Sequence, residues 1–270
     1  MPNAFSSTSL GNTGLRVSRL GLSATYRPGK KSIYFALDQG INYFFGFGID
    51  GQMKKVMRDV LKSEREKYVI ATGAYNLIWG YPNLRKTLEK RLRQWGTEYI
   101  DIFLFLGVRK ESEFPLKARE ELYQLKKEGR VKAVGMSTHD RQFAGRMAAE
   151  GALDVLMIRY NAAHRGAEKD IFPFLTAHNP GIVSFTATRW RYLLRRPKDW
   201  PKDAPLPNAR MAYRFVLSNP HVDVCMTAPT SLKQLKENLQ VLEEGPLSLE
   251  EMDFMKKFGD AVYQQKNWFM

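Results

Sequence analysis

The chain has 270 residues, of which 44% are hydrophobic and 26% charged, a composition typical of globular proteins. Its single cysteine, Cys225, cannot form an internal disulfide, so nothing in the sequence indicates an oxidising compartment. The first twenty residues lack a basic start followed by an apolar core, and no stretch approaches the ~18 apolar residues of a membrane span. We therefore expect a cytoplasmic protein without a signal peptide or a transmembrane helix.

Charge is the one unusual bulk property. Lys and Arg total 42 against 28 Asp and Glu, which gives a net charge of +14 and a pI of about 9.8. This balance fits a solvated basic surface, a pocket for an anionic cofactor, or a face for nucleic acid. The basic residues are scattered over many segments and form no tail or stripe. The distribution favours a small anion over a polymer, and we expect no nucleic-acid partner.

The N-terminal segment predicts a hairpin. Residues 10–15 read LGNTGL, in which Asn-Thr-Gly stands between apolar residues, a pattern typical of a tight turn. If the remainder forms a barrel, such a hairpin would plug its bottom.

From there on, apolar runs of strand length alternate with segments of helical periodicity. The runs are rich in β-branched and aromatic residues, and the helical segments repeat apolar residues at i, i+3 and i+4. This alternation predicts a closed parallel (β/α)8 TIM barrel, with an open doubly wound sheet as the alternative, and residues 1–270 form a single predicted domain. The predicted strands are 19–23, 41–47, 68–71, 100–106, 131–136, 155–160, 181–186 and 222–227. The predicted helices are 53–61, 84–95, 115–128, 141–150, 168–178, 209–218 and 232–242.

Two further segments lie near the C-terminus. Residues 195–208 read RRPKDWPKDAPLPN, which is too rich in proline for a helix and predicts a loop after the seventh strand. Ser248 and Glu251 have the spacing of a capping box, which predicts one extra helix over 247–258.

Several segments resemble those of aldo-keto reductases, in the family's order and spacing. The resemblance extends over nearly the whole chain and implies the same barrel, with hydride transfer between NADPH and a carbonyl compound. The segments are LGNTGLRVSRLGL (10–22), GINYF (40–44), GTEYIDIF (96–103), EGRVKAVGMS (128–137), RYNAAHR (159–165), and LSNPHVDV followed by TSLKQLKENL.

The resemblance also implies a catalytic tetrad, in which a tyrosine acts as general acid, assisted by lysine, histidine and aspartate. In this sequence the aspartate position falls on Phe45, the tyrosine position on Asp50, the lysine position on Gly73 and the histidine position on Leu106. Because the usual proton donor is replaced, we expect any activity to be weak or to use a different donor.

These replacements are physically consistent with one another. A buried lysine and a buried aspartate need each other, because removal of one leaves an unpaired charge that costs several kcal/mol, and here both positions are changed. Apolar residues, either filling the barrel themselves or lining an apolar site, are then expected at its mouth. They are Phe44, Phe45, Phe47, Phe105 and Leu106.

The resemblance further implies an NADP(H) site. Arginine side chains after the seventh strand suit pyrophosphate oxygens, and hydroxyl residues at the start of the last barrel helix suit a 2′-phosphate. Thr138 and Met157 replace the family's asparagine and glutamine, so the adenosine half is the better kept. The expected contacts are Ser137 and Phe185 at the nicotinamide, Arg189 at the pyrophosphate, and Thr230, Ser231, Gln234 and Asn238 at the adenosine end.

Asp50, Tyr75 and His139 are the candidates for a replacement acid or base. All three follow predicted strands, at the barrel face where catalysis occurs, and a histidine beside an aspartate suits proton transfer. One cysteine and four scattered histidines have no metal-ligand spacing, so we expect no metal site.

The leading hypothesis is therefore an aldo-keto reductase family protein that binds NADP(H) but lacks the usual tetrad. The alternative is a non-catalytic barrel that binds an apolar ligand or a protein partner through its mouth. The sequence leaves open the substrate, the oligomeric state and the choice between NADPH and NADH.

Overall fold

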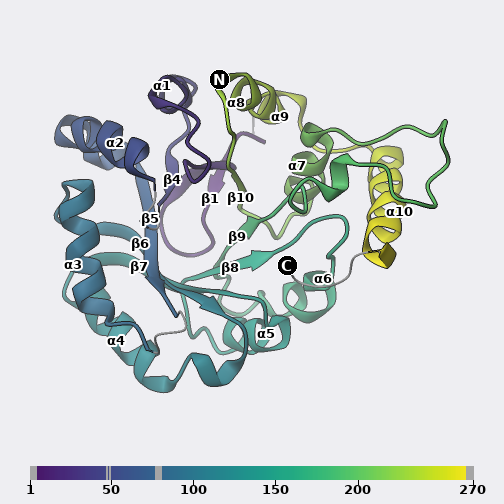
Figure 1. The fold of residues 1–270 in the computed structure, drawn as a ribbon. Helices are drawn as coiled ribbons and strands as arrows, with labels where there is room; N and C mark the ends of the chain where they lie inside the picture. Colours follow the sequence, from purple (N-terminus) through teal and green to yellow (C-terminus); the bar gives the residue numbers. More distant parts are fainter. Residues whose placement is uncertain (1–4, 47, 49, 77–80, 266–270) are drawn as a thin grey trace.

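Eight parallel strands close into a barrel, and helices surround it on the outside (Figure 1). The structure is a computed structural model that describes residues 5–46, 48, 50–76 and 81–265. The closed strand order excludes the open-sheet alternative and confirms the predicted barrel. The barrel strands are β3 (Leu20–Ser23), β4 (Tyr43–Phe45), β5 (Val69–Tyr75), β6 (Ile100–Val108), β7 (Val131–Thr138), β8 (Val155–Arg159), β9 (Gly181–Phe185) and β10 (Val224–Thr227). The helices are α1 (Lys30–Asp38), α2 (Gly51–Glu64), α3 (Leu84–Trp95), α4 (Leu116–Lys127), α5 (Arg141–Ala149), α6 (Ala167–Asp170), α7 (Ala209–Leu217), α8 (Leu232–Leu239), α9 (Val241–Glu244) and α10 (Leu249–Gln265).

Strand alternation divides the apolar core into two layers. Side chains that point outward pack against the helices, and those that point inward fill the barrel. The inner cluster comprises Leu10, Val17, Tyr43, Phe45, Val69, Ala71, Ile102, Leu104, Leu106, Ala133, Val155, Met157, Val183, Val224 and Met226.

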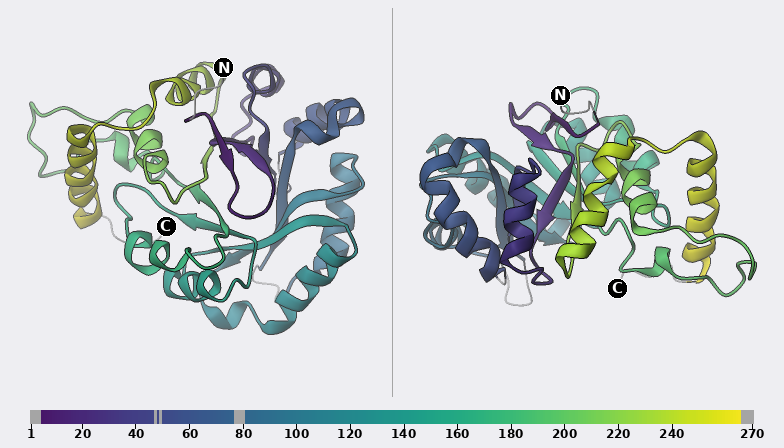
Figure 2. Two further views of the ribbon diagram at one scale, coloured as in Figure 1. Left: turned by 180° about the vertical axis from the view of Figure 1, so that it is seen from behind. Right: turned by 90° about the horizontal axis from the view of Figure 1, so that it is seen from above.

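The N-terminal hairpin closes the end of the barrel at which the strands begin, as predicted. Its strands, β1 (Ser7–Ser9) and β2 (Arg16–Ser18), pair antiparallel, and Figure 2 (left) shows them across that end. Leu10 is buried within the inner cluster. The Gly11 amide, in a turn with φ of 45°, donates to Asp223 Oδ2 over 3.1 Å. The hairpin therefore leaves only the opposite end of the barrel for a ligand.

The C-terminal helix and the proline-rich loop also match their predictions. The Ser248 amide donates to Glu251 Oε2 over 2.9 Å, and the Glu251 amide donates to Ser248 Oγ over 3.1 Å, so the capping box forms ahead of α10. Residues 195–208 form a loop that projects beside α10 in Figure 2 (right).

Three local predictions need correction. The predicted helix 168–178 ends after one turn in α6 and continues as the 3-10 turn η3 (Phe172–Phe174), because Pro173 supplies no N–H for a longer helix. The strand predicted over 68–71 extends to Tyr75, since Gly73 and its neighbours keep pairing with β6. Helix α1 was not anticipated.

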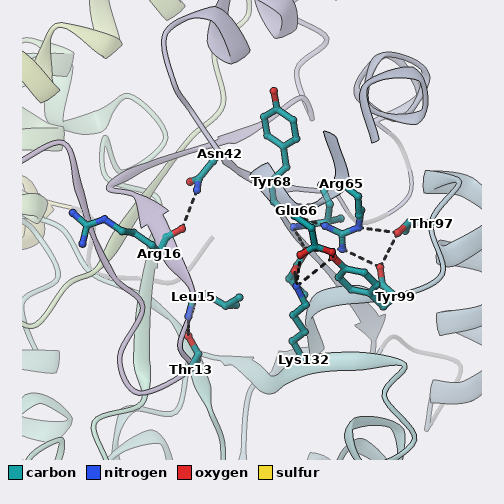
Figure 3. A network of polar contacts seen from close by, with 12 residues as sticks. Thr13, Leu15, Arg16, Asn42, Arg65, Glu66, Tyr68, Thr97, Tyr99 and Lys132 are labelled. Carbon is teal, nitrogen blue, oxygen red and sulfur yellow. Dashed lines mark hydrogen bonds and ion pairs between the residues drawn. The ribbon is translucent and has the colours of Figure 1, made fainter. Parts of the chain in front are cut away.

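A polar network ties β5, β6 and β7 together where these strands begin (Figure 3). Asp101 is buried and accepts hydrogen bonds from Arg65 (2.7 Å) and from the Ile70 amide (2.8 Å). Lys132 Nζ lies 3.2 Å from its other carboxylate oxygen. The Tyr99 ring has the Arg65 guanidinium 3.8 Å from its centroid and the Lys132 ammonium 4.3 Å away. Because the network lies at the bottom of the barrel, it stabilises the fold without touching the mouth.

Candidate functional site

A cavity of about 850 Å³ opens at the ends of the strands opposite the hairpin. Its volume lies within the range of ligand sites for molecules of drug or cofactor size. The cavity continues from the barrel mouth past the loop after β9 to α8. Its lining side chains from the strands are Ser23, Phe45, Tyr75, Leu106, Ser137, Met157, Phe185 and Met226.

Only two of the apolar residues predicted at the mouth line the cavity among the described residues. Phe45 and Leu106 line the cavity, whereas Phe44 and Phe105 belong to the outer layer because strand alternation turns them toward the helices. The Phe44 ring packs edge-on against Tyr68, with centroids 5.9 Å apart. Phe47 lies outside the described residues. The barrel does not fill its own mouth, so space for a ligand remains.

Three positions at which the resemblance predicts tetrad residues lie on neighbouring strands: Phe45 on β4, Gly73 on β5 and Leu106 on β6. A Cβ atom at Gly73 would overlap the backbone oxygen of Leu104 and would lie 2.8 Å from Leu106 Cγ. A lysine at this position would therefore require the backbone of β5 and β6 to separate.

The structure places the fourth position, Asp50, outside the cavity. Only 1% of Asp50 is exposed, and its Oδ1 accepts a hydrogen bond from the Gly48 amide over 2.9 Å. A Cβ atom at Gly46 would overlap Asp50 Oδ2 and approach Trp95 of α3, so the carboxylate lies behind the strand end. Asp50 immediately precedes α2, and the sequence does not reveal in which direction the chain turns there.

Nicotinamide-side candidates meet at the ends of β7 and β9. Ser137 and Phe185 both line the cavity, and Ser137 Oγ accepts a hydrogen bond from the Gly107 amide over 2.9 Å. The Phe185 ring lies edge-to-face with His139, with centroids 5.5 Å apart. Phe185 and Ser137 therefore present one aromatic ring and one hydroxyl to the same part of the cavity.

At the other end of the cavity, α8 supplies Gln234, Glu237 and Asn238. Asn238 Nδ2 donates to Thr227 Oγ1 over 2.9 Å, which fixes the orientation of its amide. Gln234 Oε1 accepts from both the amide and the hydroxyl of Thr230 (2.9 and 3.0 Å). Thr230 therefore lines the cavity with its donors already used.

Ser231 does not line the cavity. Its Oγ accepts from the Gln234 amide over 3.3 Å and caps α8. The helix end thus has a structural capping residue where the sequence suggested a phosphate contact.

In the loop after β9, the arginine predicted at the pyrophosphate does not line the cavity. Arg189 is only 1% exposed and packs near Trp190 and Tyr192, whereas Trp190 and Arg191 line the cavity. Residues 189–191 have φ of 52°, 50° and 72°, a left-handed turn that costs about 1–2 kcal/mol for each non-glycine residue. Because no glycine stands in this turn, the sequence does not indicate that the side-chain directions change there.

Comparison with known proteins identifies the family. A sequence model described as "Aldo/keto reductase family" matches residues 31–189, which is more than half of the chain. The chain belongs to the aldo/keto reductase family.

Aldo/keto reductase relatives match over most of their length. The uncharacterized oxidoreductase YqkF of Bacillus subtilis (strain 168) is 21% identical over 286 residues, covering 90% of this chain and 93% of that protein. L-galactose dehydrogenase of Arabidopsis thaliana is 22% identical over 281 residues, with 87% of each chain covered. The solved aldo-keto reductase AKR11C1 from Bacillus halodurans, in its holo form, aligns with a TM-score of 0.78 at 22% identity, covering 97% of this chain and 99% of that one.

Within this aldo/keto reductase barrel, Tyr75 and His139 are the candidates for proton transfer that line the cavity. Burial raises the pKa of the Tyr75 phenol above its ordinary value. Burial, with the Arg159 charge, lowers the pKa of His139 to about 4. Near neutral pH the tyrosine is therefore a protonated hydroxyl and the histidine an uncharged imidazole.

The aldo/keto reductase chain shows no group of three His, Cys, Asp or Glu side chains suited to a metal ion within its described residues. Among its described helices, none combines the length and hydropathy needed to cross a membrane.

Proposed function

We propose that this chain is an NADP(H)-dependent oxidoreductase that acts on a small carbonyl compound with low activity, using a proton donor other than the family's tyrosine. The observation that carries the proposal is one continuous cavity, which joins Phe185 and Ser137 at the barrel mouth with Asn238 on α8. An elongated site with an aromatic face at one end and amide and carboxylate groups at the other suits a dinucleotide. Membership of the aldo/keto reductase family supports the same reaction class.

The cavity residues fit the cofactor in three parts. Phe185 offers its ring for stacking on the nicotinamide, and Ser137 offers its hydroxyl to the carboxamide. Arg191 is the lining cation that suits phosphate oxygens. At the adenosine end, the fixed amide of Asn238 and the carboxylate of Glu237 suit base and ribose hydrogen bonds. When bound, a nicotinamide cofactor would supply or accept a hydride at the mouth.

Tyr75 is the donor that we assign to the substrate oxygen. It ends β5 two residues after Gly73, on the strand to which the resemblance assigns the lysine. Its raised pKa keeps the phenol protonated but makes proton release less favourable. His139 is mostly uncharged near neutral pH and suits hydrogen bonding to the substrate better than acid catalysis. A phenol that releases its proton less readily accounts for low activity.

A non-catalytic barrel remains the second candidate, favoured by the strand geometry at Gly73. Because the backbone there excludes any side chain, the mouth lacks the usual lysine position, and Leu106 and Phe45 present apolar surface instead. Such a mouth suits an apolar ligand bound for recognition.

Cofactor binding is the first test. We expect NADPH or NADH to quench the tryptophan fluorescence of the purified protein saturably, because Trp190 lines the cavity and is 40% exposed. Arg191→Gln should weaken this affinity about tenfold, the value of one charge-assisted hydrogen bond to a phosphate. Arg195→Gln is the matched control, since Arg195 lies exposed in the same loop and does not line the cavity. Absence of saturation by either dinucleotide at millimolar concentration would overturn the cofactor proposal.

Removal of the Tyr75 hydroxyl tests whether the protein is an oxidoreductase or a non-catalytic barrel. With a panel of aldehydes and the preferred dinucleotide, Tyr75→Phe should reduce kcat about a hundredfold, the value of one positioned general acid, while cofactor affinity stays unchanged. Wild-type protein that binds cofactor but turns over no aldehyde would favour the non-catalytic barrel. An unaltered kcat in Tyr75→Phe would remove Tyr75 from the mechanism.

A further inference from the structure

Cationic side chains gather beside the cavity, at the end of β8. Arg159 is the last residue of this strand and follows the cavity-lining Met157 by two positions, so strand alternation places both on the same face. In the sheet register Arg159 stands opposite Phe185, which also lines the cavity. Arg159 therefore lies at the rim, next to the proposed nicotinamide position.

Two buried nitrogen-containing side chains lie close to Arg159. Arg189 is 1% exposed and His164 is 5% exposed. Asn161 holds the intervening loop, because its Oδ1 accepts from the His164 amide (3.0 Å) and its Nδ2 donates to the Thr186 oxygen (2.9 Å). His164 Nε2 is buried and has no hydrogen-bond partner among the described residues. A buried polar nitrogen without a partner is costly and rare, which points to a ligand.

Backbone contacts bring these groups together, because the Thr186 oxygen that accepts from Asn161 Nδ2 also accepts from the Arg189 amide over 2.8 Å. Burial, and then the charges of Arg159, Arg189 and Arg141, lower the pKa of His164 to about 3. Burial, and then Arg189 and Arg141, lower the pKa of Arg159 to about 10. Asp170 pairs with Arg141 over 2.8 Å at the edge of this group. Two guanidinium groups that converge in a partly buried place produce a positive potential that attracts an anion. The uncharged imidazole of His164 adds a nitrogen that can hydrogen-bond to it.

We propose that Arg159, Arg189 and His164 form an anion-binding subsite that receives a carboxylate or phosphate group of the carbonyl substrate. A guanidinium has five N–H donors, so contacts with protein groups and with an anion are compatible. The assignment of this anion to a substrate rests on the proposed oxidoreductase function. It narrows the substrate class to carbonyl compounds that carry an anionic group.

Butyrate is the probe, and butyramide is its neutral counterpart of the same shape. In the purified wild-type protein, butyrate should perturb tryptophan fluorescence saturably, because the Arg189 guanidinium lies 5.4 Å from the Trp190 ring, and butyramide should not. Arg159→Gln should weaken butyrate binding about tenfold. Arg159→Lys should weaken it less, because a lysine keeps the charge but cannot form the two parallel hydrogen bonds of a guanidinium. Arg195→Gln, which removes one exposed charge from the nearby loop, should leave the affinity unchanged.

Thermal unfolding of each variant provides the check on folding. Butyrate should raise the Tm of the wild type and of Arg195→Gln, but not that of Arg159→Gln. Equal losses in Arg159→Gln and Arg195→Gln, or equal binding of butyramide, would overturn the subsite. Displacement of butyrate by saturating NADPH or NADH would assign the anion to the cofactor and overturn the substrate assignment. Failure of both dinucleotides to bind would refute the proposed function, whereas butyrate binding would still establish the subsite.

Discussion

Gly73→Ala is expected to lower the free energy of unfolding by about 3 kcal/mol, at the upper end of the cost of overpacking. The added Cβ atom would overlap the Leu104 backbone oxygen, which cannot move unless the β5–β6 pairing moves with it. Gly73→Lys should be more harmful, because the longer side chain also meets Leu106. Urea unfolding followed by circular dichroism measures both changes.

A control glycine and a double variant test whether the cost of Gly73→Ala comes from overlap with the Leu104 backbone oxygen. Gly51, at the first position of α2, has open space where a Cβ atom would be placed, so Gly51→Ala should stabilise by about 0.5 kcal/mol. Leu106→Ala should not rescue Gly73→Ala, because the main obstacle is backbone. A rescue would show that the Leu106 side chain alone fills the lysine position, and a mild effect of Gly73→Ala would contradict the close strand approach.

The spacing of β5 and β6 limits which side chains can occupy the mouth. If no side chain fits at residue 73, a lysine cannot be introduced there by one substitution. The sequence predicts through resemblance that Gly73 stands at the lysine position, but only the backbone geometry shows how closely Leu104 approaches it.

The sequence predicted those features that depend on local pattern. The strand and helix alternation, the Asn-Thr-Gly hairpin and the Ser248–Glu251 capping box are each encoded within a few residues, and the structure has all of them. The helix predicted over 168–178 is shorter in the structure, because one proline interrupts an otherwise helical segment.

The predicted site residues on strands all line the cavity, whereas those on connecting segments divide: His139 and Thr230 line it, and Asp50, Arg189 and Ser231 do not. Ser137 and Phe185 line the cavity because strand alternation fixes their direction. Asp50 and Arg189 do not line the cavity. The direction of Arg189 depends on a left-handed turn over residues 189–191 that no glycine or asparagine marks. Residue type alone identified the cationic loop after β9, but not which arginine faces the cavity.

Asp101→Ala is the second large effect, with an expected loss of about 3 kcal/mol of stability. The substitution leaves the Arg65 guanidinium and the Ile70 amide without their acceptor in a buried place, and truncation of one partner of a buried ion pair typically costs 3–5 kcal/mol. The low end applies because Arg65 retains its bonds to Thr97 and to the Tyr68 and Tyr99 oxygens. Chemical denaturation at neutral pH measures the change.

Asp59→Asn is the control for loss of a carboxylate charge, since the Asp59–Lys62 pair is exposed and should contribute less than about 0.5 kcal/mol. The position of Asp101 predicts no effect on the cavity, because Asp101 lies where β6 begins and the cavity lies where the strands end. Asp101→Ala should therefore lower the free energy of unfolding and leave the dinucleotide affinity unchanged. The affinity is measured at a denaturant concentration or temperature well below the unfolding midpoint of the variant. A loss below about 1 kcal/mol would mean that water replaces the missing carboxylate as the acceptor. A parallel loss of affinity would mean that the two ends of the barrel are coupled, which contradicts the separation of a stabilising bottom from a ligand-binding top.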